Sequence, residues 1–256
     1  MVASDPGSTR RSRNQDPRRL VLGSVQWGMP YGIANQGGPP DDPELARMLS
    51  RAKEAGVRTI DTARAYGESE LRIGKLLPTV PRRDGWQVIT KLAHDVHEPG
   101  VSTADALDRV FASLAASRSA LDLDGPPDLM LHRFAHRHAC GGKLWRMLLA
   151  ERDAGRLGRL GISAATPEEA WAALEDPDIE VLQVAASLLD LRLYRQGFFV
   201  RARELGRTIY VHGIFLQGVA LLDPRTLPEA MLDLVAPMQS IEACAARLGV
   251  EPRAVY

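Results

Sequence analysis

The sequence predicts an α/β protein in which parallel strands and helices alternate to form a (β/α)8 barrel of the TIM type. From Leu20 onward, short β-rich runs alternate with longer stretches of helical periodicity, which indicates repeated βαβ units. Three successive runs end in an ionisable residue, namely Asp61, Lys91 and His132, and barrel enzymes place their active sites at this end of the strands. An open dinucleotide-binding sheet would need a G-x-G-x-x-G turn after its first strand, and residues 23–28 lack that spacing.

Seven segments have the composition and length of strands. They are Leu20 to Gly23, Val57 to Asp61, Trp86 to Lys91, Leu129 to His132, Leu160 to Ser163, Val181 to Ala185 and Thr208 to Val211. Between them, apolar residues recur at intervals of three and four, so we expect helices that cover the sheet. Examples are Leu107, Val110, Phe111 and Leu114, and later Ile241, Ala245 and Leu248.

Helix boundaries are marked by capping residues and by glycines. Starts are predicted at residues 42–44, 102–103 and 166–169, where a capping residue or a first-turn proline precedes the periodic run. Ends are predicted just before Gly56, Gly155 and Gly206, because a left-handed residue often closes a helix and costs glycine least.

Length and charge favour one domain without a nucleic-acid or membrane partner. A chain of 256 residues can form one barrel or two smaller domains, and we expect a single domain over residues 20–256. The 32 Lys and Arg residues balance the 32 Asp and Glu residues, so no net field draws nucleic acid or an anionic membrane to the surface. No apolar stretch approaches the roughly 18 residues that span a bilayer.

Residues 1–19 are rich in Arg, Ser, Pro and Asp, and we expect them to form a disordered leader. The arginines at 10–13 are not followed by the apolar segment that export by a twin-arginine signal requires. Cys140 and Cys244 form neither a CxxC pattern nor a disulfide framework. The expected location is therefore the reducing cytoplasm.

Three short sequence motifs give the strongest indication of function. They are DTARAYG at residues 61–67, ITK at residues 89–91 and LHR at residues 131–133. Together Asp61, Tyr66, Lys91 and His132 resemble the catalytic tetrad of the aldo-keto reductases, and the resemblance covers residues 20–256. Each residue alone is a weak signal, but all four occur in the family's order at or just beyond strand ends.

The resemblance implies an oxidoreductase that moves a hydride between a nicotinamide cofactor and a small carbonyl or alcohol substrate. Reduction of a carbonyl places negative charge on oxygen, and Tyr66 is the implied proton donor. We expect the Lys91 ammonium to lower the pKa of this phenol and Asp61 to keep the buried lysine charged. His132 is expected to orient the carbonyl or to help relay the proton.

The implied cofactor is NADPH, with NADH as a possibility. Ser163 and Gln183 match the family residues that bind the nicotinamide amide. The asparagine that usually follows the serine is Ala164 in this chain, which removes one hydrogen bond worth about 0.5 to 1.5 kcal/mol.

The loop after the seventh strand is expected to cover the cofactor pyrophosphate through Leu216, Gln217 and Gly218. The stacking tyrosine of the family is absent at its expected place near Gly213. Trp27 is expected to form a wall of the substrate pocket, and a place in the core under a loop is an equally strong alternative.

In the family, a further helix and an eighth strand close the barrel and carry the residues that grip the adenosine phosphate. This chain stops at Tyr256 in what has the pattern of a helix start, so we expect that segment to be missing. The first and seventh strands would then have unpaired edges. Three explanations are open, namely a part of a longer protein, strands that pair across a distorted gap, or cover by another chain. We expect the first.

Two other function classes remain as alternatives. A truncated, non-catalytic or regulatory relative would keep the barrel walls without binding the cofactor tightly. A metal-dependent hydrolase would use His132, His136, His138 and Cys140, but neither CxxC nor HExxH accompanies them, so we expect no metal. The substrate and the oligomeric state do not follow from the sequence.

Overall fold

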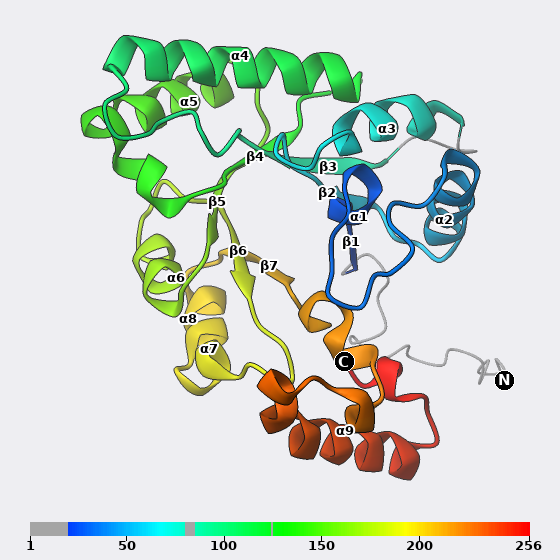
Figure 1. Cartoon of the computed structure of the whole chain (residues 1–256). Coiled ribbons are helices and arrows are strands. Elements are labelled where there is room, and N and C mark those ends of the chain that lie inside the picture. The colour runs from blue at the N-terminus through cyan, green and yellow to red at the C-terminus, as the bar shows by residue number, and fades with distance from the viewer. Residues whose placement is uncertain (1–19, 80–84, 124) are drawn as a thin grey trace, which may run out of the picture.

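The computed structural model describes residues 20–79, 85–123 and 125–256, which fold into a curved seven-stranded parallel sheet with helices on its outside (Figure 1). Each strand pairs with the next in the order β1 to β7. The strands are β1 Val21–Gly23, β2 Thr59–Asp61, β3 Gln87–Lys91, β4 Asp128–Leu131, β5 Leu160–Ala164, β6 Val181–Ala185 and β7 Thr208–His212. The predicted leader at residues 1–19 lies outside the described residues.

All seven predicted strands are present, and their ends differ from the prediction by at most two residues. In the described part of the chain β1 pairs with β2 alone and β7 with β6 alone, so these two strands form the edges of the sheet. Pairing of the edge strands across a distorted gap is therefore not found. The architecture is that of a TIM-type barrel whose wall is nearly closed.

The helices lie between the strands and cover the outer face of the sheet (Figure 1). They are α1 Val25–Gly28, α2 Asp42–Glu54, α3 Ser69–Leu76, α4 Thr103–Leu121, α5 Lys143–Asp153, α6 Pro167–Leu174, α7 Arg192–Arg195, α8 Phe198–Glu204 and α9 Val235–Leu248. Short 3-10 turns are η3 Leu77–Thr79, η4 Phe134–Gly142, η5 Leu216–Leu221, η6 Pro224–Thr226, η7 Glu229–Leu234 and η8 Pro252–Ala254.

The predicted helix boundaries are largely confirmed. The Ser102 and Thr166 hydroxyls each accept a hydrogen bond from the backbone N–H three residues later, at 3.1 and 3.2 Å. The cap of α2 is Asp41, one residue earlier than predicted, because its carboxylate accepts from the N–H of Glu44 at 2.7 Å. The glycines after the helices are left-handed, with φ of 92°, 71° and 66° at Gly56, Gly155 and Gly206.

Successive layers of side chains fill the inside of the barrel. The middle layer is apolar and joins Ile89, Met130 and Val181 with Tyr210. Because side chains alternate along a strand, residues two positions further toward the carboxyl ends face the same interior. This register brings Lys91, His132, Gln183 and His212 to one end of the barrel.

A polar layer closes the opposite end of the barrel interior. The Arg159 guanidinium donates to Asp128 at 2.7 Å, to the Thr208 hydroxyl at 3.2 Å and to the Tyr210 hydroxyl at 3.1 Å. The Gln87 amide also donates to Asp128, at 2.7 Å. These bonds join β3, β4 and β7 with Arg159, the residue before β5, beneath the apolar layer, so protein side chains occupy the amino end of the barrel.

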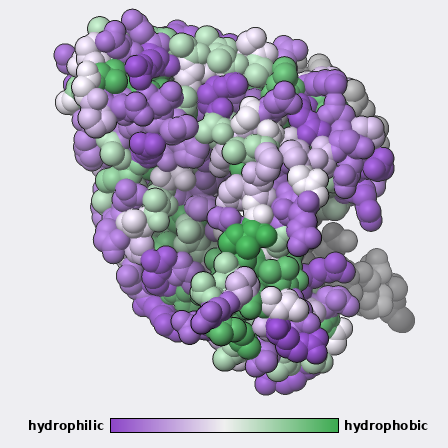
Figure 2. Space-filling model, viewed as in Figure 1, coloured by the Kyte–Doolittle hydropathy of each residue, from purple (hydrophilic) through white to green (hydrophobic). Residues whose placement is uncertain are grey.

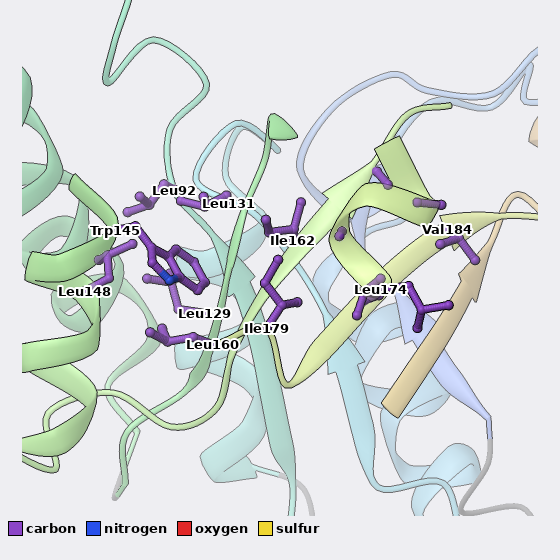
Figure 3. Close-up of a cluster of buried hydrophobic side chains, with 14 of the residues drawn as sticks. Leu92, Leu129, Leu131, Trp145, Leu148, Leu160, Ile162, Leu174, Ile179 and Val184 are labelled. Carbon is purple, nitrogen blue, oxygen red and sulfur yellow. The ribbon is translucent and has the colours of Figure 1, made fainter. Parts of the chain in front are cut away.

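The largest apolar cluster lies between the sheet and helices α5, α6 and α8 (Figure 3). Trp145 of α5 packs against residues of β4 and β5 such as Leu129 and Leu160. Two residues of the predicted apolar faces instead point to solvent, since Phe111 is 47 % and Leu248 is 65 % exposed. Each lies at the margin of a helix face whose centre is buried.

The surface is mainly polar, and apolar residues gather where the loop after β1 meets η5 to η7 (Figure 2). A shallow pocket of about 250 Å³ lies there, lined by Ile33, Leu216, Gln217, Val219, Met231 and Leu234. Among the described residues, no helix combines the length and the apolar character that crossing a membrane requires.

Leu160→Ala should lower the free energy of unfolding by about 2 to 5 kcal/mol, because Leu160 is fully buried between β5 and α5. Leu248→Ala, at a side chain that is 65 % exposed, should change it by less than about 0.5 kcal/mol. Urea denaturation of the two variants checks this, and equal losses would contradict the described core.

Candidate active site

A buried ion pair lies at the carboxyl end of the strands. Lys91, at the end of β3, is 1 % exposed, and its Nζ contacts the two Asp61 carboxylate oxygens at 2.7 and 2.9 Å. The ammonium also donates to the Thr62 carbonyl at 3.0 Å. An ammonium at this depth is costly unless it is paired, and the Asp61 carboxylate at the end of β2 supplies the opposite charge.

Tyr66 lies against this charge. Its hydroxyl is 3.4 Å from the Lys91 Nζ, and the ammonium lies 5.0 Å from the centre of the phenol ring. The turn that carries Tyr66 is tied to β3, since the Thr62 N–H donates to the Ile89 carbonyl at 2.8 Å and the Arg64 N–H donates to the Lys91 carbonyl at 3.1 Å. The predicted grouping of an acid, a tyrosine and a lysine is thus formed.

Two glycines allow the Tyr66 turn to approach the segment after β1. A Cβ atom added to Gly28 would lie 1.8 Å from the Tyr66 carbonyl oxygen. A Cβ atom on Gly67 would lie 2.3 Å from the Gly28 oxygen, and Gly67 also has a left-handed φ of 55°. Only a residue without a side chain fits at either position.

The pKa of Tyr66 is raised above its usual value near 10. Burial of the phenol is the largest cause, the Lys91 charge opposes it, and Asp61 adds to the rise. The expectation of a lowered pKa was therefore wrong in its net direction, although Lys91 acts in the expected direction. The phenol stays protonated at neutral pH.

His132 follows β4 and faces the same group. Its ring centre lies 5.9 Å from that of Tyr66, and the two rings are nearly perpendicular. Burial lowers the pKa of His132 to about 4, and the Lys91 charge adds to the shift. The imidazole is therefore neutral at physiological pH. Its Nδ1 is buried and has no hydrogen-bond partner among the described residues.

A hydrogen-bonded chain leads from the ion pair to β5. The Gln183 amide nitrogen donates to Asp61 Oδ1 at 3.0 Å, and the Ser163 hydroxyl donates to the Gln183 amide oxygen at 3.2 Å. Ser163 and Gln183 are partners in the register of β5 and β6. Ala164, the next residue, is 2 % exposed and packs in the outer core instead.

The loop after β7 has a strained backbone and contacts the loop after β1. Leu216, Gln217 and Gly218 have successive positive φ values of 45°, 56° and 91°, which cost a residue with a Cβ about 1 to 2 kcal/mol each. The Ala34 N–H donates to the Gln217 carbonyl at 3.3 Å, and a Cβ on Gly218 would lie 2.7 Å from the Ala34 Cβ.

Trp27 lies in the core, which is one of the two positions that the sequence allowed. It is 4 % exposed and packs with Leu45 and Leu49 of α2 and with Ile60. This position favours a packing role over a pocket wall. Tyr31, a few residues later and 40 % exposed, couples electrostatically to Tyr66.

His212 is a site residue that the sequence analysis missed. It ends β7, pairs with Ala185 in the register of β6 and β7, and interacts electrostatically with Asp61 and Lys91. Desolvation of the imidazole is the largest cause that lowers the pKa of His212. The Lys91 charge adds to this shift, and the Asp61 charge opposes it. The alternation of inward-facing residues from Tyr210 to His212 was the signal that could have found it.

A second pocket and the search for a metal site offer weaker candidates for the active site. A pocket of about 650 Å³ lies beside α9 and η8, but none of the four predicted catalytic residues lines it, and its Asp223 and Arg225 pair with each other. Within the described ranges, no three His, Cys, Asp or Glu side chains are grouped in a way that could hold a metal ion. The chemistry is concentrated around Tyr66 and Lys91.

Comparison with known proteins agrees with this geometry. Residues 19–230 match the model of the aldo/keto reductase family. A curated relative, D-threo-aldose 1-dehydrogenase of a Pseudomonas species, is 29 % identical over 203 residues, which cover 66 % of this chain and 60 % of the relative. The chain thus spans less than two thirds of that relative's length.

Solved structures share the fold. The glycerol dehydrogenase of Gluconobacter oxydans is 21 % identical with a TM-score of 0.67, covering 91 % of this chain and 76 % of its own. An aldo-keto reductase from Bacillus halodurans is 23 % identical with a TM-score of 0.61, covering 82 % and 66 %. At such identities the likeness concerns the barrel alone.

His132 should titrate with a pKa of about 4 in the folded protein. An unfolded chain takes up this proton near pH 6.5. The unfolded state therefore binds more protons between these values, and stability should fall as the pH drops from 6.5 to 4. NMR of the imidazole signals checks this, with His132→Gln to assign the signal. Titration near pH 6.5 would show a solvated ring.

Proposed function

Because the chain belongs to the aldo-keto reductase family, we propose that it is an oxidoreductase that transfers a hydride between a nicotinamide cofactor and a small carbonyl or alcohol substrate. The observation that carries this proposal is the Tyr66 hydroxyl 3.4 Å from a buried lysine that is paired with Asp61. A lysine that served only as a solvated surface charge would be neither buried nor paired with a carboxylate.

In reduction, Tyr66 donates the proton. A reduced nicotinamide, when bound, supplies the hydride that adds to the carbonyl carbon. As the C=O π electrons move to oxygen, the phenol gives that oxygen its proton and becomes a phenolate, which Lys91 stabilises. The phenol begins in the protonated form, and the Lys91 charge, which acts to lower the pKa of Tyr66 against the effect of burial, favours loss of that proton. In oxidation of an alcohol the proton moves in the opposite direction.

His132 is proposed to orient the substrate. A pKa of about 4 leaves the ring neutral at physiological pH, so it offers one N–H donor and holds no extra proton to deliver. This favours Tyr66 over His132 as the acid. The ring's position 5.9 Å from the phenol supports a hydrogen bond to the same carbonyl oxygen.

Ser163 and Gln183 are proposed to hold the nicotinamide carboxamide. A carboxamide has one acceptor oxygen and two N–H donors, and the hydroxyl and primary amide at this register offer both complements. Leu216, Gln217 and Gly218 are proposed to cover the pyrophosphate. The proposed cofactor is NADPH, with NADH as the alternative that the same carboxamide contacts allow.

The substrate is proposed to be a hydroxylated aldehyde or the matching cyclic sugar. The name of the curated relative, an aldose dehydrogenase, supports an aldose as the first compound to test. His132 and Tyr31 interact with Tyr66, and His212 interacts with Asp61 and Lys91. These polar side chains support a substrate with hydroxyl groups.

Tyr66→Phe tests the proposed proton transfer. The variant should lose about 100-fold or more in kcat for aldehyde reduction with NADPH, because general acid catalysis contributes about that much. Its Kd for NADPH, from fluorescence titration, should stay within about twofold. Tyr194→Phe, at a tyrosine that is 70 % exposed, is the matched control. No binding of NADPH or NADH to the parent protein at millimolar concentration would favour the non-catalytic alternative.

Ser163→Ala tests the proposed carboxamide contact. Loss of one hydrogen bond worth about 0.5 to 1.5 kcal/mol should raise the Kd for NADPH roughly 2- to 13-fold. Ser240→Ala removes a hydroxyl that donates to the Ala236 carbonyl within α9 and should leave this Kd unchanged. Equal Kd values for the two variants would count against Ser163.

A further inference from the structure

Glu70, in the first turn of α3, is a buried carboxylate that the proposed chemistry does not use. It is 1 % exposed. A charge at this depth is costly unless it is paired and hydrogen-bonded, and Glu70 meets this condition by contacts to the segments that carry Tyr66 and Lys91. The segment 61–67 and β3 are thus joined by one side chain.

The contacts of Glu70 reach both sides of the site. Its Oε2 forms an ion pair with the Arg64 guanidinium, and its Oε1 accepts from the Thr90 hydroxyl at 2.5 Å. Arg64 lies two residues before Tyr66, and Thr90 directly precedes Lys91. The backbone N–H of Arg64 also donates to the Lys91 carbonyl at 3.1 Å.

From these contacts we propose that Glu70 is a positioning residue that holds the Tyr66 hydroxyl against the Lys91 ammonium. The inference rests on the proposed function, in which Lys91 stabilises the Tyr66 phenolate. The Tyr66 turn is exposed at Gly67, and the backbone bonds of Thr62 and Arg64 tie its first half to β3. The Arg64–Glu70 pair and the Glu70–Thr90 bond link the middle of this turn, the first turn of α3 and β3 through one carboxylate.

Three variants separate positioning from stability. Glu70→Gln keeps an acceptor for Thr90 but removes the ion pair. Arg64→Met leaves Glu70 buried without its cation. The double variant removes both charges, so its Tm should recover part of the loss seen in Arg64→Met. Asp128→Asn is the matched control, since Asp128 is a buried carboxylate paired with Arg159 at the opposite end of the barrel.

We expect kcat to fall about tenfold or more in Glu70→Gln, because displacement of a reacting group by a fraction of an ångström is enough for such a loss. The Kd for NADPH should stay within about twofold. In the double variant kcat should remain low while Tm recovers, and Asp128→Asn should lower Tm with kcat close to the parent value. Recovery of kcat together with Tm, or an equal loss of kcat in Asp128→Asn, would overturn the proposal.

A readout without cofactor separates this inference from the proposed function. In protein labelled with 13C on the tyrosine rings, Tyr66→Phe assigns the Tyr66 signal among the five tyrosines of the chain. That signal should shift in Glu70→Gln and stay in place in Asp128→Asn. If the parent protein is inactive but the signal shifts, the proposed function fails and the contact stands. If the parent is active and the signal is unmoved, the positioning role fails.

Discussion

The ion pair between Lys91 and Asp61 is the interaction on which the rest of the site depends. A lysine that is 1 % exposed needs a compensating charge, and the register of β2 and β3 places the Asp61 carboxylate beside it. The same carboxylate accepts from Gln183, so one group connects the proposed proton donor to the proposed cofactor contacts. Without Asp61, a neutral lysine would leave the Tyr66 phenolate without an electrostatic partner.

The sequence predicted best the features that depend on local patterns, namely strand ends and helix caps. Strand ends were predictable because β-rich runs stop at polar residues, and parallel strands bring such residues to one end of a barrel, as with Asp61, Lys91 and His132. The same alternation would have identified His212, two residues beyond the inward-facing Tyr210. A capping side chain can be predicted equally well, and the only error there was one residue at Asp41.

The burial of individual side chains could not be predicted from the sequence. Trp27 looked equally suited to a pocket or to the core, and only the packing of α2 against β2 shows that it is 4 % exposed. For Tyr66 the sign of the Lys91 effect was predictable, but the larger effect of desolvation depends on neighbours distant in sequence. Glu70 was not singled out from the sequence, because its proposed role depends on Thr90, which lies 20 residues away.

The polar layer around Arg159 makes the two ends of the barrel interior unequal. Arg159, Asp128 and the apolar side chains above them occupy the amino end, so a molecule cannot reach Tyr66 by that route. The approaches that this architecture leaves are the carboxyl end, where Lys91 and His132 lie, and the side of the wall at which the described strands β1 and β7 do not pair. A molecule bound at Tyr66 therefore has the same layers of side chains beneath it, whichever approach it used.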